Sequence, residues 1–287
     1  MKIKVENLRF SYGSNRVLNI SSAEFEHGKI YGIVGKNGVG KTTFFKVLTN
    51  IIINYSGNVL INGEPAKTNL KALSKVGIVL DDMELYKNQT GLFNMRYFGG
   101  LRGGFDEEQA LRLARELNIF DSINKKVNIY SLGMRKKLIL LISIINNAET
   151  LIFDEPFRGL DFQSVNWFKN YLLDLKNKGC MILISSHVQE DIESMSDKVL
   201  VLAEGDFRST FDLKDSSQEY IYSVEISNKT SFVELLQTKE IPFMEQGKFV
   251  KFELDEVKYK ELFKEAVTQE IEFYQIKKEN KFVNLIK

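Results

Sequence analysis

The residues best suited to chemistry in this chain form one run, Gly35-Lys36-Asn37-Gly38-Val39-Gly40-Lys41-Thr42-Thr43. This run is a complete G-x-x-x-x-G-K-[ST] phosphate loop, and it follows the apolar strand-like segment Ile30–Val34. Its glycines let backbone N–H groups close around phosphates, Lys41 reaches the terminal phosphates, and the Thr42 hydroxyl can hold Mg²⁺. We therefore predict that residues 35–43 bind a nucleoside triphosphate.

A second candidate lies about 110 residues later, where an apolar strand ends in two neighbouring acids, Asp154 and Glu155. A buried parallel strand explains the apolar run but not the paired acids at its C-terminal end, where ligands bind in open α/β sheets. In a phosphate-loop site the first acid, Asp154, can support Mg²⁺, and the second, Glu155, can orient or deprotonate the attacking water. An isolated Asp-Glu pair would be explained as a solvated turn; its place after a phosphate loop favours hydrolysis.

The elements that must position these residues alternate between apolar strands and amphipathic helices as far as about residue 213. This order predicts an α/β domain with a mainly parallel sheet. The expected strands are Ile30–Val34, Val76–Leu80, Thr150–Phe153, Met181–Ser185 and Lys198–Leu202. The expected helices are Phe105–Ile119, Met134–Ile145 and Phe162–Lys176.

The last part of the chain has a different pattern of apolar and polar residues. It follows the polar stretch 214–218, which we interpret as a domain boundary. Residues 218–287 are expected to form a small α+β accessory domain of βαββαβ-like order, similar to a ferredoxin fold. The predicted elements are strand Tyr220–Ile226, helix Ser231–Lys239, strand Lys248–Leu254, helix Asp255–Thr268 and a final hairpin around residues 277–280.

Composition narrows the class of protein. The 287 residues include 39 lysines and arginines against 38 acids, so the broad positive field that non-specific nucleic-acid binding requires is missing. The longest apolar run, Leu138–Ile145, is far shorter than the roughly 20 residues of a membrane-spanning helix. The single cysteine, Cys180, lies in an apolar run and is expected to be buried in a protein of the reducing cytoplasm.

Over residues 1–213 the sequence resembles the nucleotide-binding subunit of ATP-binding cassette (ABC) transporters. Tyr12 sits where that family stacks an aromatic ring on adenine. Ser131 and Gly133 occupy the signature motif that contacts ATP held by the opposite subunit. Asp161 lies in the loop after the acidic strand, and His187 matches the switch histidine that engages the γ-phosphate.

This resemblance implies a phosphate-loop ABC ATPase domain with a mainly parallel sheet, an antiparallel β subdomain and a helical subdomain at about residues 81–140. It also implies ATP and Mg²⁺ as cofactors, a second ATPase subunit that is a copy of this chain, and a membrane permease on a separate chain. The protein would then be cytoplasmic and peripheral, held at the inner face of the cell membrane by its permease. No nucleic-acid partner is expected.

Two positions depart from the common family pattern. Leu132 replaces the first signature glycine, which resembles the version in bacterial exporters of antibiotic peptides and drugs, so we expect efflux of a peptide antibiotic, drug or lipid-like compound. Asp81 and Asp82 stand where the family has a glutamine that touches Mg²⁺ and senses the membrane subunit. Asp81 can still accept a metal ion or water, but with shorter reach and a different charge.

The sequence leaves three alternatives open. The apolar cluster of Phe93, Met95, Tyr97 and Phe98 either packs in a core or forms a groove for a helix of the membrane partner. The chain could instead be a non-transport ABC ATPase acting on nucleic acid or ribosomes, although its charge balance disfavours this. A module that holds ATP without turnover is a third class, against which Glu155 and His187 argue.

Overall fold

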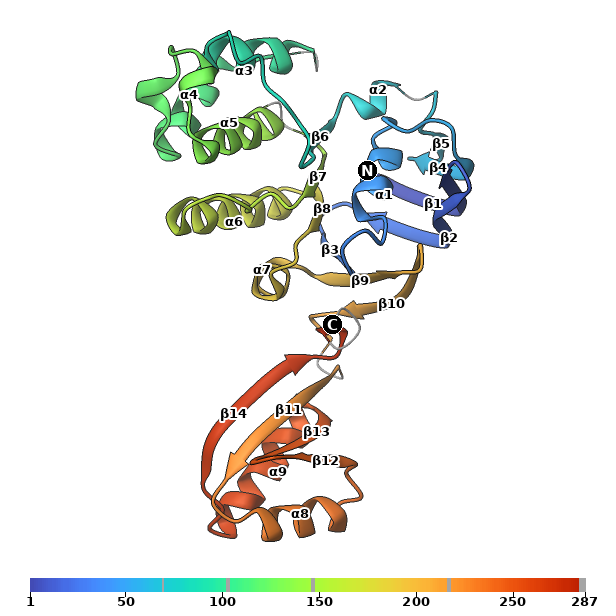
Figure 1. The fold of residues 1–287 in the computed structure, drawn as a ribbon, viewed down its shortest axis with the longest axis vertical. Helices are drawn as coiled ribbons and strands as arrows, with labels where there is room; N and C mark the ends of the chain where they lie inside the picture. The colour runs from blue at the N-terminus through green and yellow to red at the C-terminus, as the bar shows by residue number, and fades with distance from the viewer. Residues whose placement is uncertain (69, 102–103, 146–147, 216–217, 284–287) are drawn as a thin grey trace. The chain divides into compact units, whose positions relative to one another are not determined.

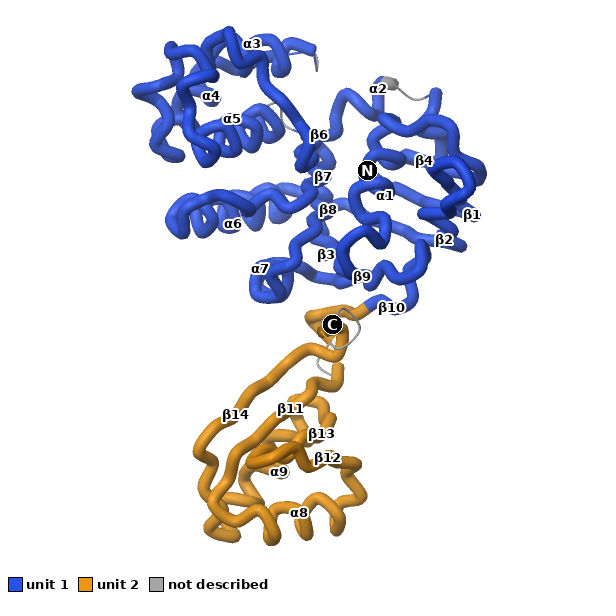
Figure 2. The backbone as a smooth tube through the Cα atoms, in the orientation of Figure 1, with its two compact units in different colours: residues 1–210 blue, residues 211–287 orange. Residues whose placement is uncertain are grey.

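A computed structural model describes residues 1–287 except 69, 102–103, 146–147, 216–217 and 284–287. The chain divides into two compact units, Met1–Thr210 and Phe211–Lys287, which Figure 2 shows in blue and orange. Residues 216 and 217 of the predicted linker lie outside the described residues.

The first unit is built on a six-stranded sheet of order β10-β9-β3-β8-β7-β6. Its pairs β9–β3, β3–β8, β8–β7 and β7–β6 are parallel, which confirms the mainly parallel sheet. All residues of β3, β7 and β8 are buried, which explains their mostly apolar sequences; the polar exceptions, Thr150, Asp154 and Ser185, lie at the ends of β7 and β8. The strands are β3 (Ile30–Val34), β6 (Val76–Val79), β7 (Thr150–Asp154), β8 (Met181–Ser185), β9 (Lys198–Ala203) and β10 (Asp206–Asp212).

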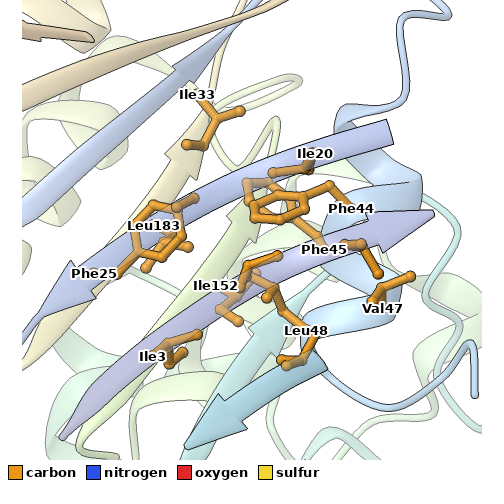
Figure 3. Close-up of a cluster of buried hydrophobic side chains, with 14 of the residues drawn as sticks. Ile3, Ile20, Phe25, Ile33, Phe44, Phe45, Val47, Leu48, Ile152 and Leu183 are labelled. Atoms are coloured by element: carbon orange, nitrogen blue, oxygen red, sulfur yellow. The ribbon is translucent and has the colours of Figure 1, made fainter. Parts of the chain in front are cut away.

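A four-stranded antiparallel sheet of order β2-β1-β4-β5 packs over helix α1 (Lys41–Leu48). Its long strand β1 alternates buried apolar and exposed polar residues, as one covered face requires. Figure 3 shows side chains of both sheets meeting those of α1 in one core, which includes Ile3, Phe25, Phe44, Ile152 and Leu183. The strands are β1 (Lys2–Tyr12), β2 (Asn15–Glu26), β4 (Ser56–Ile61) and β5 (Glu64–Pro65).

Helices α3 (Gly91–Gly100), α4 (Glu107–Glu116) and α5 (Leu132–Ile144) form a separate group in Figure 1. Side-chain caps fix where they begin: the predicted start of α4 is Phe105, but the helix starts at Glu107, because Asp106 accepts the backbone N–H of Gln109. A cap of this kind stabilises a helix by about 1 kcal/mol. The remaining helices of this unit are α2 (Leu70–Leu73), α6 (Phe162–Asn177), α7 (Gln189–Met195) and the 3₁₀ turns Phe120–Ser122 and Val127–Ile129.

The second unit confirms the βαββαβ order, with an antiparallel sheet of order β12-β13-β11-β14. Tyr222, Phe232 and Phe252 are buried in a core between this sheet and the two helices. Strand β12 has no clear sequence signal, because it is only four residues long and mostly exposed. The elements are β11 (Glu219–Ile226), α8 (Lys229–Thr238), β12 (Phe243–Gln246), β13 (Phe249–Asp255), α9 (Glu256–Thr268) and β14 (Phe273–Asn280).

The predicted terminal hairpin around residues 277–280 is wrong. These residues continue the single strand β14, where Lys277 is paired with Ser223 and Asn280 with Tyr220 of β11. The run Lys277-Lys278-Glu279-Asn280 has no glycine or proline to force a turn, and continued pairing with β11 satisfies its backbone groups. A charged strand at the edge of a sheet can thus resemble a turn in its sequence.

Cys180 is buried, and burial raises the pKa of its thiol to about 12. This confirms its expected role as a small core residue. Among the described residues, no helix combines the length and apolar character that crossing a bilayer requires.

Candidate nucleotide-binding site

The phosphate loop connects β3 to α1 in a turn that only glycine fits at two points. A Cβ atom on Gly35 would lie 2.3 Å from the carbonyl oxygen of Leu202. Gly40, the residue before α1, has a φ of 112°, which other residues rarely adopt. The loop therefore folds tightly enough to direct the N-terminus of the eight-residue helix α1 at a bound anion, as the motif requires.

Lys41 is held against the loop by its own ammonium group. Its Nζ atom donates to the carbonyl oxygen of Gly35 at 2.7 Å and to that of Lys36 at 3.2 Å. Burial lowers the pKa of Lys41, while the nearby carboxylates of Glu155 and Asp154 act in the opposite direction. The lysine is thus a positive charge placed between the loop and the two acids.

Asp154 ends β7 and is 2% exposed. The Thr42 hydroxyl donates to its Oδ2 atom, and the Ser185 hydroxyl donates to Oδ1 at 2.5 Å. Sequence reasoning missed Ser185, although its position at the end of a predicted neighbouring strand could have indicated it: Asp154 and Ser185 are partners in the β7–β8 register. The carboxylate is therefore fixed from both α1 and β8.

Glu155 has a left-handed backbone with a φ of 48°, a conformation that costs a non-glycine residue about 1–2 kcal/mol. Its backbone N–H donates to the carbonyl oxygen of Ser185 at 3.2 Å and to the Ser185 hydroxyl at 3.1 Å. Its Oε2 atom lies 2.8 Å from Nδ1 of His187. The structure thus brings together the two residues predicted to be catalytic, Glu155 and His187.

Asp154 and Glu155 share a pocket of about 320 Å³ with residues of the phosphate loop, whereas His187 contacts Glu155 but does not itself line the pocket. The pocket also includes Asp81, as expected for a residue at the end of β6, and Arg158, which sequence reasoning did not single out. Arg158 belongs to no sequence motif, and it comes to lie beside Asp81 only when the chain folds. The lining residues are Asn37, Gly38, Gly40, Lys41, Thr42, Thr43, Asp81, Asp154, Glu155 and Arg158.

Asp81 and Asp82, which stand where the family has a glutamine, have different partners. Asp81 Oδ2 lies 3.4 Å from Nη1 of Arg158, at the pocket. Asp82 Oδ2 lies 2.6 Å from Nζ of Lys46 on α1 and does not line the pocket. The segment after β6 is therefore tied to the loop after β7 and to the helix after the phosphate loop.

Tyr12 lies at the end of β1 and is 55% exposed. Its ring meets that of Phe10 edge-on, with the ring centroids 4.8 Å apart. More than half of Tyr12 is open to solvent, which is compatible with stacking on a flat apolar ligand. The predicted contact of Tyr12 with adenine stays a prediction.

Three further predicted contacts, Ser131, Gly133 and Asp161, do not line the pocket of their own chain. The Ser131 hydroxyl caps α5 by accepting the N–H of Met134 at 3.2 Å, and a Cβ atom on Gly133 would lie 3.2 Å from the carbonyl oxygen of Gly159. Asp161 caps α6 and lies 2.8 Å from Nζ of Lys137. These three residues thus gather around the contact between α5 and the loop before α6.

Comparison with known proteins addresses the family. Residues 18–158 match the sequence model of the family described as ABC transporter. An uncharacterized ABC transporter ATP-binding protein of Methanocaldococcus jannaschii is 33% identical over 264 residues, which cover 89% of this chain and 93% of the relative. The chain belongs to the family of ABC transporter ATP-binding proteins. It is therefore an ATP-binding ATPase of the kind that powers transport.

Other relatives and solved structures agree with this assignment. The bacitracin transport ATP-binding protein BcrA of Enterococcus faecalis is 35% identical over 205 residues, covering 71% of this ABC ATPase and 67% of the relative. The lantibiotic transport ATP-binding protein SrtF of Streptococcus pyogenes is 32% identical over 203 residues, covering 71% and 87%. A structure described as the ATP-binding subunit of an ABC transporter has a TM-score of 0.69 at 24% identity, covering 75% of this chain and 91% of its own. The expected ABC ATPase fold is confirmed.

Proposed function

We propose that this chain pairs with a second copy of itself around two ATP molecules and drives a separate membrane permease that exports a peptide antibiotic, drug or lipid-like compound. The observation that carries the proposal is the division of the predicted ATP contacts. Six residues of the phosphate loop and both acids line one pocket, while Ser131 and Gly133 lie elsewhere on the same chain. A site that needs both sets is completed by a second chain.

The oxygens at the pocket suit Mg²⁺. The Thr42 hydroxyl and the Asp154 carboxylate are hydrogen-bonded to each other and offer the hard oxygen ligands that this ion prefers. Among the described residues, no group of three or more His, Cys, Asp and Glu could hold a metal ion without help. This fits Mg²⁺, which binds through one or two protein groups together with substrate phosphates. The bound ion would neutralise charge on the phosphates.

Glu155 is the proposed base for the attacking water. Its side chain is mostly buried, it is anchored through its backbone to Ser185, and its Oε2 atom faces Nδ1 of His187. A carboxylate so held can take a proton from water without reorienting. His187 then acts by fixing the carboxylate and by presenting its exposed ring to the terminal phosphate, as the family pattern suggests.

Exposed apolar side chains near the signature motif support the homodimer. Leu132 and Phe162 are 74% and 79% exposed, and Leu132 lies close to Gly159 in the loop before α6. Large apolar side chains at the surface mark contact sites when they gather around functional residues. Here Leu132 lies between Ser131 and Gly133, the residues that would reach the partner's ATP, and Phe162 follows Asp161 at the start of α6.

The helical group offers a surface for the permease. The rings of Tyr86, Phe93, Tyr97 and Phe98 form a cluster in which the centroids of neighbouring rings lie 5.1 to 6.3 Å apart. Tyr86, Phe93 and Tyr97 are at least 40% exposed, whereas Met95, the other member of the cluster named from the sequence, is fully buried. Core packing therefore accounts for Met95, and the exposed rings suit an apolar helix of the membrane partner.

Export of a peptide-like or lipid-like compound has two supports. Leu132 gives the signature the sequence found in bacterial exporters of antibiotic peptides and drugs, and two relatives are described as lantibiotic and bacitracin transport ATP-binding proteins. Each of these similarities covers 71% of this chain. The proposed direction of transport and class of substrate rest on this similarity.

Co-expression tests the proposal. The chain would be expressed with a polytopic membrane protein encoded beside its gene and purified from detergent through a tag on that protein. We expect the chain to co-purify, and its ATP turnover to rise in inside-out vesicles when a cationic peptide antibiotic is added. A variant with Tyr97→Glu, which places a charge among the exposed rings, should be lost from the complex while still binding ATP. Co-purification of Tyr97→Glu in normal yield would contradict the docking surface.

A further inference from the structure

We propose that Asp81 and Arg158 act as one neutral pair in the wall of the nucleotide pocket, in which Arg158 compensates the Asp81 charge so that an anionic nucleotide can bind. In this role Arg158 is a positioning residue for the nucleotide, and Asp81 is its anchor and not a metal ligand. The inference rests on the ATP-binding role of the pocket, and it deepens that role by naming what sets the pocket's charge.

The fold brings the two residues together from separate strands. Asp81 follows β6 and Arg158 follows β7, and these strands are parallel neighbours in which Val79 is paired with Phe153. Because the carboxyl ends of parallel strands lie at one edge of a sheet, both side chains reach the same pocket. There Oδ2 of Asp81 lies 3.4 Å from Nη1 of Arg158.

The pair contributes little to folding. The side chains of Arg158 and Asp81 are 66% and 51% exposed, and solvent weakens an ion pair of this kind. An ion pair that stabilises the fold so little is important for where it lies, in the wall of the nucleotide pocket. Both residues line the pocket that contains Lys41 and Thr42.

The charges in the pocket explain why compensation is needed. Asp154 and Glu155 already place two carboxylates beside the phosphate loop, and Asp81 adds another. Each uncompensated carboxylate repels the phosphates of a nucleotide, and the repulsion is larger near the protein than in bulk water. Arg158 places a positive charge at the carboxylate that lies on the β6 side of the pocket.

A basic side chain of the helical group, Lys136, also lies near the carboxylates of the pocket. Lys136 on α5 is partly buried, and burial lowers its pKa, whereas the charges of Asp81, Asp154 and Glu155 act to raise it. Lys136, Asp81 and Arg158 also line a neighbouring pocket of about 350 Å³. Asp81 thus lines both cavities, and basic side chains reach them from α5, with Arg135 and Lys136, and from the loop after β7, with Arg158.

The chain supplies a matched control one residue away. Asp82 forms an ion pair with Lys46 that is shorter than the Asp81 pair, yet Asp82 lines neither pocket. Asp82→Asn therefore removes a charge and an ion pair from the same segment without changing the pocket wall. Any effect that is specific to the pocket must be absent in this variant.

The experiment measures the Kd of the full chain for a non-hydrolysable Mg²⁺-ATP analogue by calorimetry. We expect Arg158→Gln to raise Kd about two- to fivefold, the range an exposed charge pair supports, and Arg158→Lys to restore it. The double variant Asp81→Asn/Arg158→Gln should return to within about twofold of the parent, and Asp82→Asn should match the parent. The increase in Kd should shrink as salt is raised, because salt screens exposed charges.

Steady-state turnover and a Mg²⁺ titration complete the test. Arg158→Gln should raise the KM for ATP by a larger factor than the one by which it lowers kcat, since the pair acts on binding in the ground state. The Mg²⁺ concentration for half-maximal turnover should stay the same in Asp81→Asn. A rise of about tenfold in that concentration would overturn the proposal and make Asp81 a metal ligand.

Two further results would also overturn it: an unchanged Kd in Arg158→Gln, or a double variant that binds as weakly as the single one. Circular dichroism of each variant separates these results from misfolding. Because the analogue is not hydrolysed and no permease is present, failure here is distinct from failure of the proposed transport function, which co-purification tests.

Discussion

His187 and Glu155 face each other across the end of β8: Nδ1 of the histidine lies 2.8 Å from Oε2 of the glutamate, and the His187 backbone N–H donates to the same oxygen at 3.4 Å. The two residues are 32 positions apart, so the contact depends on the parallel pairing of β7 with β8. With its backbone also bound to Ser185, Glu155 is held through both its side chain and its main chain. The rate of ATP hydrolysis should therefore fall when either Glu155 or His187 is substituted.

The first prediction separates binding from hydrolysis. Glu155→Gln keeps the shape of the side chain but removes the base, so ATP affinity should be retained while turnover falls about 100-fold or more. Lys41→Ala removes the buried ammonium group of the phosphate loop and should weaken ATP binding itself. Equilibrium binding and phosphate release measure the two defects, and near-normal turnover in Glu155→Gln would reject the assignment.

The second prediction concerns His187. His187→Ala removes the contact at Oε2 and should lower kcat by about tenfold or more, with a smaller change in the affinity for ATP. The chain has only one other histidine, His27, which lies in a turn away from the pocket and provides a matched control. His27→Ala should have normal turnover. Equal losses in the two variants would mean that the effect is not specific to the Glu155 contact.

Much of the central sheet could be predicted because its strands are buried on both faces. The predicted bounds of β3 and β8 match the structure to the residue, since an apolar run between polar turns shows where a fully buried strand begins and ends. The phosphate loop was equally accessible, because its binding groups are contiguous and each residue type has a fixed task. A short segment of sequence is sufficient to predict a feature that depends on that segment alone.

The partners of the site residues were not predictable in the same way. Ser185 fixes Asp154 through the register of two strands, and Arg158 reaches Asp81 because β6 and β7 are neighbours in the sheet. Strand order is decided by long-range packing, which no short window of sequence contains. The prediction for the edge strand β14 failed for a related reason: its charged residues resemble a turn unless the pairing with β11 is known.

The third prediction concerns assembly. Glu155→Gln chains should change from monomer to dimer when ATP is added, because hydrolysis no longer separates the subunits. Adding Ser131→Arg should prevent this, since bulk and charge would block the contact with the partner's nucleotide. Light scattering with and without ATP measures the change, and Ser11→Arg, at an exposed position of β1, is a control for added charge. A Ser131→Arg protein that still dimerises with ATP would contradict the shared site.

The fourth prediction concerns pH. The hydrogen bond with Lys137, followed by those with the backbone and hydroxyl of Ser164, holds the pKa of Asp161 well below its usual range. A carboxyl with a lowered folded-state pKa contributes stability that is present above its unfolded value of about 4 and is lost as the pH falls below it. Asp161→Asn should therefore make the free energy of unfolding depend less on pH between about pH 5 and 2. Urea melts across this range measure the slope, and an unchanged slope would contradict the role of Asp161.

The last prediction concerns the second unit. We expect residues 218–287 to act as an accessory domain that stabilises or modulates the ATPase dimer and supplies no group to the nucleotide site. All residues that line the nucleotide pocket lie in the first unit, and the second has its own core of Tyr222, Phe232, Phe252 and their neighbours. A chain shortened to residues 1–213 should therefore bind ATP with near-normal affinity, while its ATP-dependent dimerisation or turnover changes. Circular dichroism provides the control for folding, because a shortened chain that is folded but cannot bind ATP would show that the second unit contributes to the site.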